Sequence, residues 1–192
     1  MGNAQAPSND DDLDAEYAQM CDGYDAKTGC RSITAEEILP LMNDDKSMVY
    51  IIDTRGENEH LVSTLPGAHL VVPNIGVLSM SYKTPLPDPA TIPSDAMVVC
   101  HCTAGLRSGW TAVDLEKIWQ RPIYSLKGGI ISWSNAGGKL VVPTSKTEVD
   151  ETSGAEAAAA ETAAAAVVET EKVHTYSATW GKFLKKKSQA IY

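Results

Sequence analysis

Between residues 31 and 143, short apolar runs that favour strands alternate with segments that have the features of helices. Apolar residues on consecutive positions predict strands that are covered on both faces. Thr34 is a favourable N-cap for a first helix, and the apolar spacing over 108–119 is helical. The expected strands are 47–53, 66–73, 96–100 and 121–126, and the expected helices begin at 34, 108 and 128. This order predicts an α/β fold with a largely parallel sheet and helices on both faces.

The 192 residues are enough for one ordinary core and additional tails. Residues 1–25 hold seven acids and no Lys or Arg, whereas 172–192 hold five lysines and no acid. An Ala-, Glu- and Thr-rich tract before the basic end has little to bury, which is typical of a solvated helix or a linker. The expected organisation is an acidic, disordered extension over 1–30, a domain over 31–143, an Ala/Glu-rich linker over 144–171 and a flexible basic aromatic tail over 172–192.

Composition and charge exclude several classes of protein. The net charge of -9 and the pI near 4.8 argue against nucleic-acid partners, because nucleic-acid binding needs a basic face. No apolar run approaches the ~20 residues that cross a bilayer. The start MGNAQAPSND lacks the basic and apolar regions of a secretory signal, and the four cysteines are expected to be thiols. These features predict a cytoplasmic protein.

The segment VVCHCTAGLRSG, residues 98–109, joins the third predicted strand to the helix over 108–119. In a parallel sheet, the carboxyl ends of the strands form the functional edge. Backbone N–H groups of a loop at that edge, together with a helix N-terminus, favour an anion. Cys102 is therefore expected to be a nucleophilic thiolate, and Gly105 allows the loop to curl tightly.

Four motifs in this region occur in the order of a known family. CTAGLRS resembles a loop of the form C-x-x-G-x-R-S, and IIDTRGENEH resembles a strand-end D-x-R followed by a glutamate segment. LPGAHLVVP resembles a P-G-A motif, and LKGGIISWSNAG resembles a closing G-G-h-x-x-W-x-x-x-G signature. Together the motifs span the predicted domain, which resembles the single-domain rhodanese (sulfurtransferase) family.

The resemblance implies the rhodanese fold, a five-stranded parallel sheet flanked by helices that holds the cysteine loop at its edge. It also implies that Cys102 carries a persulfide, and that Asp53 and Arg55 form an ion pair that supports the loop. The other residues of the active-site loop would bind the substrate: Thr103, Ala104, Gly105, Leu106, Arg107 and Ser108.

Other residues near these motifs receive mostly structural interpretations. Cys100 lies on the same strand face as Cys102 and is expected to pack in the core, with a resolving thiol as the alternative. The C-H-C run has no second cluster of ligands, so no metal site is predicted. Arg107 is expected to direct its guanidinium fork to loop carbonyls or to an anionic substrate. No role is assigned to Cys21 or Cys30. The expected turn, surface or packing residues are Glu59, His60, His69, Gly129 and Trp133.

The predicted activity is sulfur transfer without a cofactor. In the reaction that the resemblance implies, the Cys102 thiolate takes the outer sulfur of thiosulfate or a persulfide, and a thiol, cyanide or protein acceptor then removes it. A scaffold module without turnover is one alternative. The other is a phosphatase or arsenate reductase, but only four residues separate Cys102 from Arg107, against five in the HC-x5-R phosphate loop. Such a loop is expected to be too tight for phosphate.

The donor is left open by the loop composition. Thr103, Ala104 and Leu106 are uncharged, unlike the basic loop of thiosulfate-preferring members of the family. A low-molecular persulfide or a protein partner is therefore a candidate donor beside thiosulfate.

Features at both ends of the sequence concern where in the cell the protein is located. MGNAQA begins like an N-myristoylation signal at Gly2, although Ala6 stands where Ser or Thr is usual. The carboxyl end, KVHTYSATWGKFLKKKSQAIY, mixes aromatic residues with lysines. It is expected either to fold back onto the acidic amino end or to contact an anionic membrane or an acidic partner.

Overall fold

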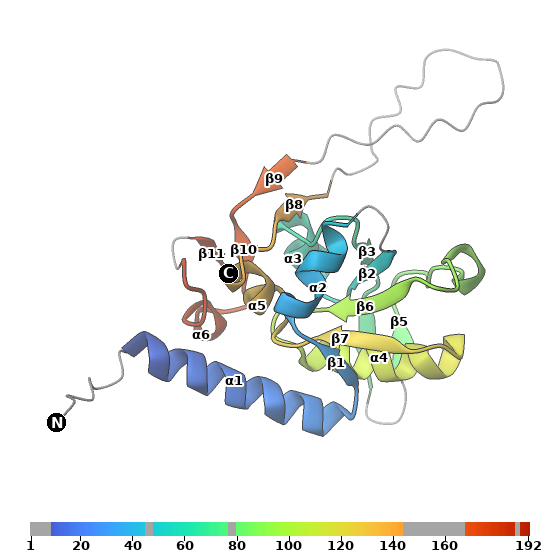
Figure 1. Ribbon diagram of the computed structural model, residues 1–192, viewed down its shortest axis with the longest axis horizontal. Helices are drawn as coiled ribbons and strands as arrows, with labels where there is room; N and C mark the ends of the chain where they lie inside the picture. The colour runs from blue at the N-terminus through green and yellow to red at the C-terminus, as the bar shows by residue number, and fades with distance from the viewer. Residues whose placement is uncertain (1–8, 45–47, 77–79, 144–167, 187–188) are drawn as a thin grey trace, which may run out of the picture.

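The computed structural model describes residues 9–44, 48–76, 80–143, 168–186 and 189–192. Its centre is a sheet with the strand order β1-β7-β6-β2-β3, in which every pairing is parallel (Figure 1). The strands are β1 (Arg31–Ile33), β2 (Val49–Asp53), β3 (His69–Leu70), β6 (Met97–His101) and β7 (Ile123–Leu126). The predicted α/β fold with a five-stranded parallel sheet is confirmed.

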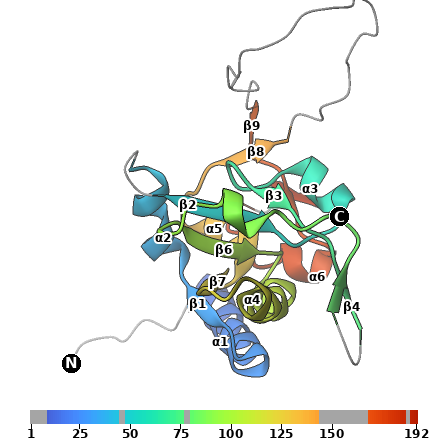
Figure 2. The ribbon, with the colours of Figure 1, turned by 90° about the vertical axis from the view of Figure 1, so that its right-hand side faces the viewer.

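Helices cover both faces of this sheet, and Figure 2 shows α2 and α4 on opposite sides of it. Successive side chains of a strand point to opposite faces, so Ile51 joins one core cluster and Ile52 the other. Helices α2 (Ala35–Met42) and α5 (Gly129–Asn135) pack into the first cluster, and α4 (Leu106–Trp119) packs into the second. Each fully buried aliphatic side chain contributes roughly 1.5–3 kcal/mol, so the strand ends are held by a substantial core.

The predicted first helix begins at its predicted N-cap. The Thr34 hydroxyl accepts a hydrogen bond from the Glu37 N–H at 3.3 Å, and the Glu37 carboxylate accepts one from the Thr34 N–H at 2.9 Å. This reciprocal arrangement satisfies two amides that the first turn leaves unpaired. The other predicted strands and helices correspond to β2, β3, β6, β7, α4 and α5. The sequence pattern did not predict β1, because three residues are too few to display a period.

Shorter elements complete the fold. Within the described residues, three pairs of strands lie outside the central sheet: β4–β5 and β8–β9 are antiparallel, and β10–β11 is parallel. The shorter elements are α3 (Glu57–Val62), β4 (Pro73–Ile75), β5 (Met80–Tyr82), η1 (Pro89–Thr91), β8 (Leu140–Val142), β9 (Val168–Thr170), β10 (Val173–His174), α6 (Ala178–Gly181) and β11 (Ala190–Ile191).

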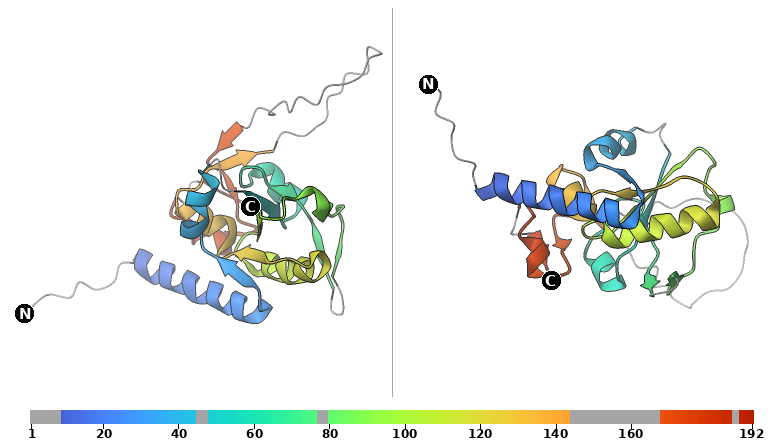
Figure 3. Two further views of the ribbon diagram at one scale, coloured as in Figure 1. Left: turned by 45° about the vertical axis from the view of Figure 1, so that its right-hand side comes forward. Right: turned by 90° about the horizontal axis from the view of Figure 1, so that it is seen from below.

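The prediction of a disordered extension over 1–30 is wrong for its described part, because Asn9–Thr28 form helix α1. Figure 3 shows α1 running along the outside of the domain. Tyr17 and Cys21 are buried in the same core cluster as α5, and the Tyr17 hydroxyl donates to the Gly128 carbonyl at 2.6 Å. The acidic composition indicated disorder, but these two side chains dock the helix on the domain.

The C-terminal segment packs beside α1, which is the fold-back alternative (Figure 3). Phe183 and Leu184 are buried in the core, and the Phe183 and Tyr17 ring centroids lie 4.7 Å apart. Two exposed ion pairs also join the segments: Lys182 with Glu16 at 2.7 Å and Lys185 with Asp14 at 3.2 Å. The packed unit therefore extends beyond 31–143 at both ends.

Two predictions fall on segments that the structure does not describe. Residues 144–167 of the predicted linker lie outside the described residues, while Val168–Thr170 form β9, which pairs with β8. Gly2, the predicted lipidation site, also lies outside them. Within the described ranges, none of the helices combines the length and the apolar character needed to span a bilayer.

Candidate active site

Cys102 lies at the carboxyl end of β6, directly before the turn that opens α4. Its side chain is on the wall of a pocket, although the residue is only 2 % exposed. Two donors face its sulfur: the Gly105 N–H at 3.2 Å and the Ser108 hydroxyl at 3.5 Å. Such donors stabilise a thiolate, which is the nucleophilic form of sulfur. The loop therefore presents one positioned sulfur atom to the pocket.

Helix α5 fixes the shape of the loop from behind. The Ile130 N–H donates to the Cys102 carbonyl at 2.8 Å, and the Ile131 N–H donates to the Thr103 carbonyl at 3.4 Å. Gly129 makes this close approach feasible, because a Cβ there would lie 2.2 Å from the Cys102 carbonyl oxygen. Gly129 was expected to be only a turn residue, but its missing side chain is what lets α5 reach the loop.

Gly105 closes the turn at the N-cap of α4. Its φ of 105° lies in the left-handed region that favours glycine. Its carbonyl accepts a hydrogen bond from the Gly109 N–H at 2.9 Å and lies 3.1 Å from the Ser108 hydroxyl oxygen, whose single proton can be donated to this carbonyl or to the Cys102 sulfur. The Ser108 hydroxyl also lies 2.9 Å from the Ser125 hydroxyl on β7. Ser108 thus ties the sulfur to the helix and to the neighbouring strand.

Arg107 braces the loop through Glu59 of α3. Its two terminal nitrogens contact the two carboxylate oxygens of Glu59 at 2.7 Å each, and one of them also donates to the Thr103 hydroxyl at 2.8 Å. The Thr103 hydroxyl contacts Glu59 at 3.0 Å. The predicted fork is therefore present, but it engages a carboxylate and a hydroxyl rather than loop carbonyls. A bidentate pair of this kind fixes both distance and orientation.

Glu59 was expected to be an ordinary turn residue, and this expectation is wrong. The residue is only 6 % exposed. Burial acts to raise the pKa of its carboxyl, but the hydrogen bonds and charge of Arg107 outweigh burial and lower it. Glu59 is therefore an ionised partner of the loop. The glutamate segment of the motif IIDTRGENEH was the signal that could have identified it.

Asp53 is the centre of a buried network under the loop. Arg55 donates to it from the backbone N–H at 3.0 Å, from Nε at 2.9 Å and from Nη2 at 2.7 Å. His60, which was expected to be a surface residue, is buried and contacts Asp53 at 2.9 Å, and the Thr64 hydroxyl donates to Asp53 at 2.8 Å. The Asp53–Arg55 ion pair is thus part of a larger set of contacts.

Charge and burial have opposite effects on the pKa of the Asp53 carboxyl. Burial acts to raise the pKa of its carboxyl, but the charge that His101 carries at low pH, the charge of Arg55 and the hydrogen bonds of His60 and Arg55 together hold that pKa well below its usual range. The Asp53 carboxylate therefore stays ionised and serves as a fixed point for the strand end.

His69 was predicted to be a surface residue. It is exposed and stacks on Tyr50 with ring centroids 4.5 Å apart.

His101 connects the Asp53 network to the cysteine loop. Its carbonyl accepts from the Thr54 N–H at 2.8 Å, and its Nε2 lies 3.3 Å from the Thr64 hydroxyl oxygen. Burial lowers the pKa of His101 to about 4, so the ring is neutral at physiological pH. Across the described residues, no group of three or more His, Cys, Asp or Glu is arranged to hold a metal ion.

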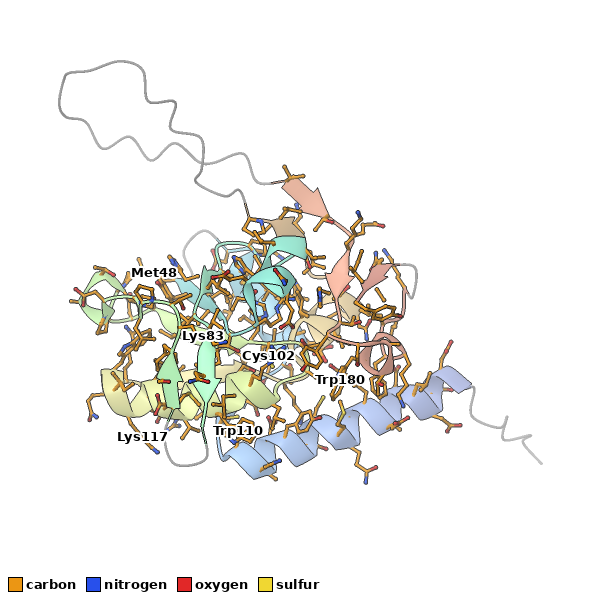
Figure 4. The ribbon with its side chains drawn as sticks, turned by 180° about the vertical axis from the view of Figure 1, so that it is seen from behind. Met48, Lys83, Cys102, Trp110, Lys117 and Trp180 are labelled. Atoms are coloured by element: carbon orange, nitrogen blue, oxygen red, sulfur yellow. The ribbon has the colours of Figure 1, made fainter. Side chains whose placement is uncertain are left out.

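The pocket at Cys102 has a volume of about 260 Å³. The cysteine loop forms one side of it, and three aromatic residues from outside the predicted domain form the other: Tyr24, Tyr176 and Trp180. Figure 4 shows Cys102 near the centre of the molecule and Trp180 beside it, next to α1. Nothing in the sequence pattern indicated that segments so far apart would meet at the loop.

The other cysteines have structural surroundings. Cys100 is fully buried in the second core cluster, and burial raises the pKa of its thiol. Burial likewise raises the pKa of Cys21 to about 12. Cys30 is half-buried near Asp25. The core position predicted for Cys100 is confirmed, and Trp133 is buried as a packing residue.

Comparison with known protein families shows to which family the chain belongs. The family model of the rhodanese-like domain matches residues 34–136. No curated protein matches the chain. Solved structures are also similar to it, and three of them serve as examples. A Rhodopseudomonas palustris protein of unknown function, described as a possible tyrosine phosphatase, is 21 % identical with a TM-score of 0.45, over 72 % of this chain and 97 % of its own.

The thiosulfate sulfurtransferase of Pseudomonas aeruginosa is 24 % identical with a TM-score of 0.45, over 65 % of this chain and 22 % of its own. A rhodanese-like domain protein of Staphylococcus aureus is 22 % identical with a TM-score of 0.42, over 59 % of this chain and 99 % of its own. The family assignment rests on the sequence match, which spans more than half of the 192 residues. The chain belongs to the rhodanese-like domain family.

Proposed function

We propose that this protein is a sulfurtransferase that carries a sulfane sulfur as a persulfide on Cys102. The observation that carries the proposal is the Cys102 sulfur, which accepts a hydrogen bond from the Gly105 N–H at 3.2 Å in a residue that lines a pocket. A scaffold module without turnover would not need a sulfur held against a backbone amide. Nor would it need the bidentate Arg107–Glu59 pair that fixes the loop around that sulfur.

The reaction has two steps. In the first, the Cys102 thiolate attacks the outer sulfur of the donor, a new S–S bond forms, and the donor's S–S bond breaks. The leaving sulfite or thiolate takes the electron pair of that broken bond. In the second, a thiolate, cyanide or protein cysteine attacks the terminal sulfur of the persulfide, and the Cys102 thiolate leaves. Both steps conserve charge and need no cofactor.

The loop supports the charge that this cycle creates. The persulfide is an anion, and the Gly105 N–H and the Ser108 hydroxyl are the donors that already face the sulfur. Phosphatase chemistry is less well supported, because an arginine that closes a phosphate loop must bind the phosphate. Here both terminal nitrogens of Arg107 contact Glu59 at 2.7 Å.

The proposed partners are a small sulfur donor and a thiol, cyanide or protein acceptor. All four cysteines are free thiols, which supports a reducing, cytoplasmic location. A contact between the tail and an anionic membrane stays a prediction. Phe183 and Leu184 are buried, so its lysines would have to carry most of that contact.

Replacement of the nucleophile tests the proposal. The full-length protein is incubated with a sulfane donor and digested without reductant, and the mass of each cysteine peptide is measured. We expect the mass of one sulfur to be added to the Cys102 peptide. Cys102→Ser should abolish both this adduct and the transfer of sulfur from the same donor to cyanide.

Cys100→Ser is the matched control. It removes a thiol two residues away on the same strand, and most of the activity should remain because Cys100 is fully buried in the core. Full activity in Cys102→Ser would overturn the proposal. Release of phosphate from an aryl phosphate, lost in the same variant, would instead support the phosphatase alternative.

A further inference from the structure

The pocket wall opposite Cys102 is built by segments outside the matched family region. Tyr24 comes from α1, Tyr176 follows β10, and Trp180 belongs to α6, whereas the family match covers 34–136. Tyr24 and Trp180 form a tilted ring pair with centroids 6.3 Å apart. Two chain ends thus converge to place aromatic surface over the cysteine loop.

The backbone at Tyr176 is held in a strained conformation. Its φ of 68° lies in the left-handed region, which is unusual for a tyrosine. The Tyr176 N–H donates to His174 Nδ1 at 3.1 Å, and the Ser177 N–H donates to the Thr175 carbonyl at 2.8 Å. These bonds fix the turn, so the Tyr176 ring lies 5.4 Å from the Arg107 guanidinium carbon. Strain maintained by surrounding contacts is a feature of ligand sites.

The charges at the pocket do not suit a small inorganic dianion. Among the described residues that line the pocket, Arg107 is the one with a cationic side chain. Both of its terminal nitrogens contact Glu59 at 2.7 Å, so the positive charge is already neutralised by a carboxylate. Thiosulfate would have to enter an aromatic pocket without a free counter-charge, and burial of an unpaired charge is costly.

We propose that this pocket selects a ring-bearing thiol or its persulfide that carries no charge other than that of its reacting sulfur, and that Tyr24, Tyr176 and Trp180 determine this specificity. The inference rests on the proposed sulfur transfer and names the substrate class of the same site. An aromatic ring on the substrate would pack against the three side chains, which gives it an affinity that a small polar thiol lacks.

The step that this class of substrate undergoes is the second half of the cycle. The acceptor thiolate attacks the terminal sulfur of the Cys102 persulfide and forms a new S–S bond. The bond between the two sulfurs of the persulfide breaks, and Cys102 leaves as a thiolate. The product is the persulfide of the ring-bearing thiol. When that persulfide is the donor, the same bonds form and break in the reverse direction.

The experiment first loads the full-length protein with a sulfane donor and measures the persulfide on Cys102 by mass. The loaded protein is then discharged with three probe thiols: benzylthiol, 2-mercaptoethanol and mercaptosuccinate. Rates are expressed per thiolate as kcat/KM. We expect benzylthiol to exceed 2-mercaptoethanol by about tenfold, since each tenfold corresponds to about 1.4 kcal/mol of ring burial. Mercaptosuccinate should be the slowest.

Substitutions of the aromatic pocket residues test whether the preference for benzylthiol comes from these side chains. Trp180→Ala and Tyr176→Gly should bring the ratio of the kcat/KM values for benzylthiol and 2-mercaptoethanol close to one. Glycine is chosen at position 176 because it retains the backbone conformation there. Trp110→Ala and Tyr192→Ala are matched controls, because neither residue lines the pocket. Both controls should keep the wild-type ratio.

The outcomes separate the two proposals. If Cys102 is not loaded by any donor, the proposed function fails and the substrate class fails with it. Loading followed by equal rates for the three thiols would overturn the substrate class alone. A preference for benzylthiol that persists in both wall variants would also overturn it, because the three aromatic residues would then not be its source.

Discussion

The two sides of the pocket are built in different ways. The side that carries the sulfur comes from one contiguous stretch, residues 102–108, and its hydrogen bonds run to the next strand and helices. The opposite side comes from Tyr24 of α1, Trp180 of α6 and Tyr176 of the turn between β10 and α6. The residues of the proposed chemistry are therefore encoded locally, while the shape and polarity of the pocket around them depend on long-range packing. A change to the first side should affect turnover, and a change to the second should affect selection.

The largest effect is expected under the loop, at Asp53. Asp53→Asn removes the partner of the Arg55 guanidinium, both side chains being 0 % exposed. Breaking a buried pair costs about 3–5 kcal/mol, because the remaining charge stays buried and unpaired. Denaturant unfolding should show this loss of stability at neutral pH. A loss below ~1 kcal/mol would show that the network does not hold the strand end.

This prediction has a defined pH dependence. The Asp53 pKa is well below its usual range in the folded protein, and about 3.9 in the unfolded chain. Its stabilisation is therefore complete above the unfolded pKa and disappears as the pH falls through the folded pKa. The part of the stability difference between wild type and Asp53→Asn that comes from ionisation of Asp53 should be constant above about pH 4 and shrink below it.

Gly129 tests the support behind the loop, with a smaller expected cost. A Cβ there would lie 2.2 Å from the Cys102 carbonyl oxygen, and φ is 54°. Gly129→Ala should cost about 2–4 kcal/mol from crowding and the left-handed backbone. It should also slow persulfide formation.

Gly137→Ala is the control for backbone strain alone. Gly137 has a φ of 84°, but apart from its chain neighbours no heavy atom of the described residues lies within 4 Å of its Cβ position. This variant should lose about 1–2 kcal/mol and keep its persulfide. If Gly129→Ala and Gly137→Ala behaved alike, contact between α5 and the loop would not matter.

The sequence predicted one side of this comparison and not the other. The α/β order, Cys102 and its loop could be predicted because apolar periods and a contiguous motif are local signals. Helix α1 was missed because its acidic composition concealed two docking residues, Tyr17 and Cys21. Glu59 was assigned to the surface because its partner, Arg107, lies 48 residues away. Burial of a polar side chain depends on contacts that a single sequence does not display.

The smallest effect is expected at the ion pairs that join the two chain ends. Lys182 and Glu16 are 2.7 Å apart, with side chains 41 % and 54 % exposed. Solvent screens such pairs, so Lys182→Ala should cost less than about 1 kcal/mol, and less still at high salt. Thermal unfolding at two salt concentrations measures this. A loss as large as that of Asp53→Asn would mean that charge, rather than Phe183 and Tyr17, docks the C-terminal segment.

The most direct test of the account follows the sulfur atom itself. The protein is loaded with radiolabelled sulfane sulfur, excess donor is removed, and an acceptor thiol is added while the label is followed in time. The account predicts one labelled sulfur on the Cys102 peptide, which then moves to the acceptor at least as fast as steady-state turnover. Label on another residue, or label on Cys102 that leaves more slowly than turnover, would contradict the claim that Cys102 carries the sulfur.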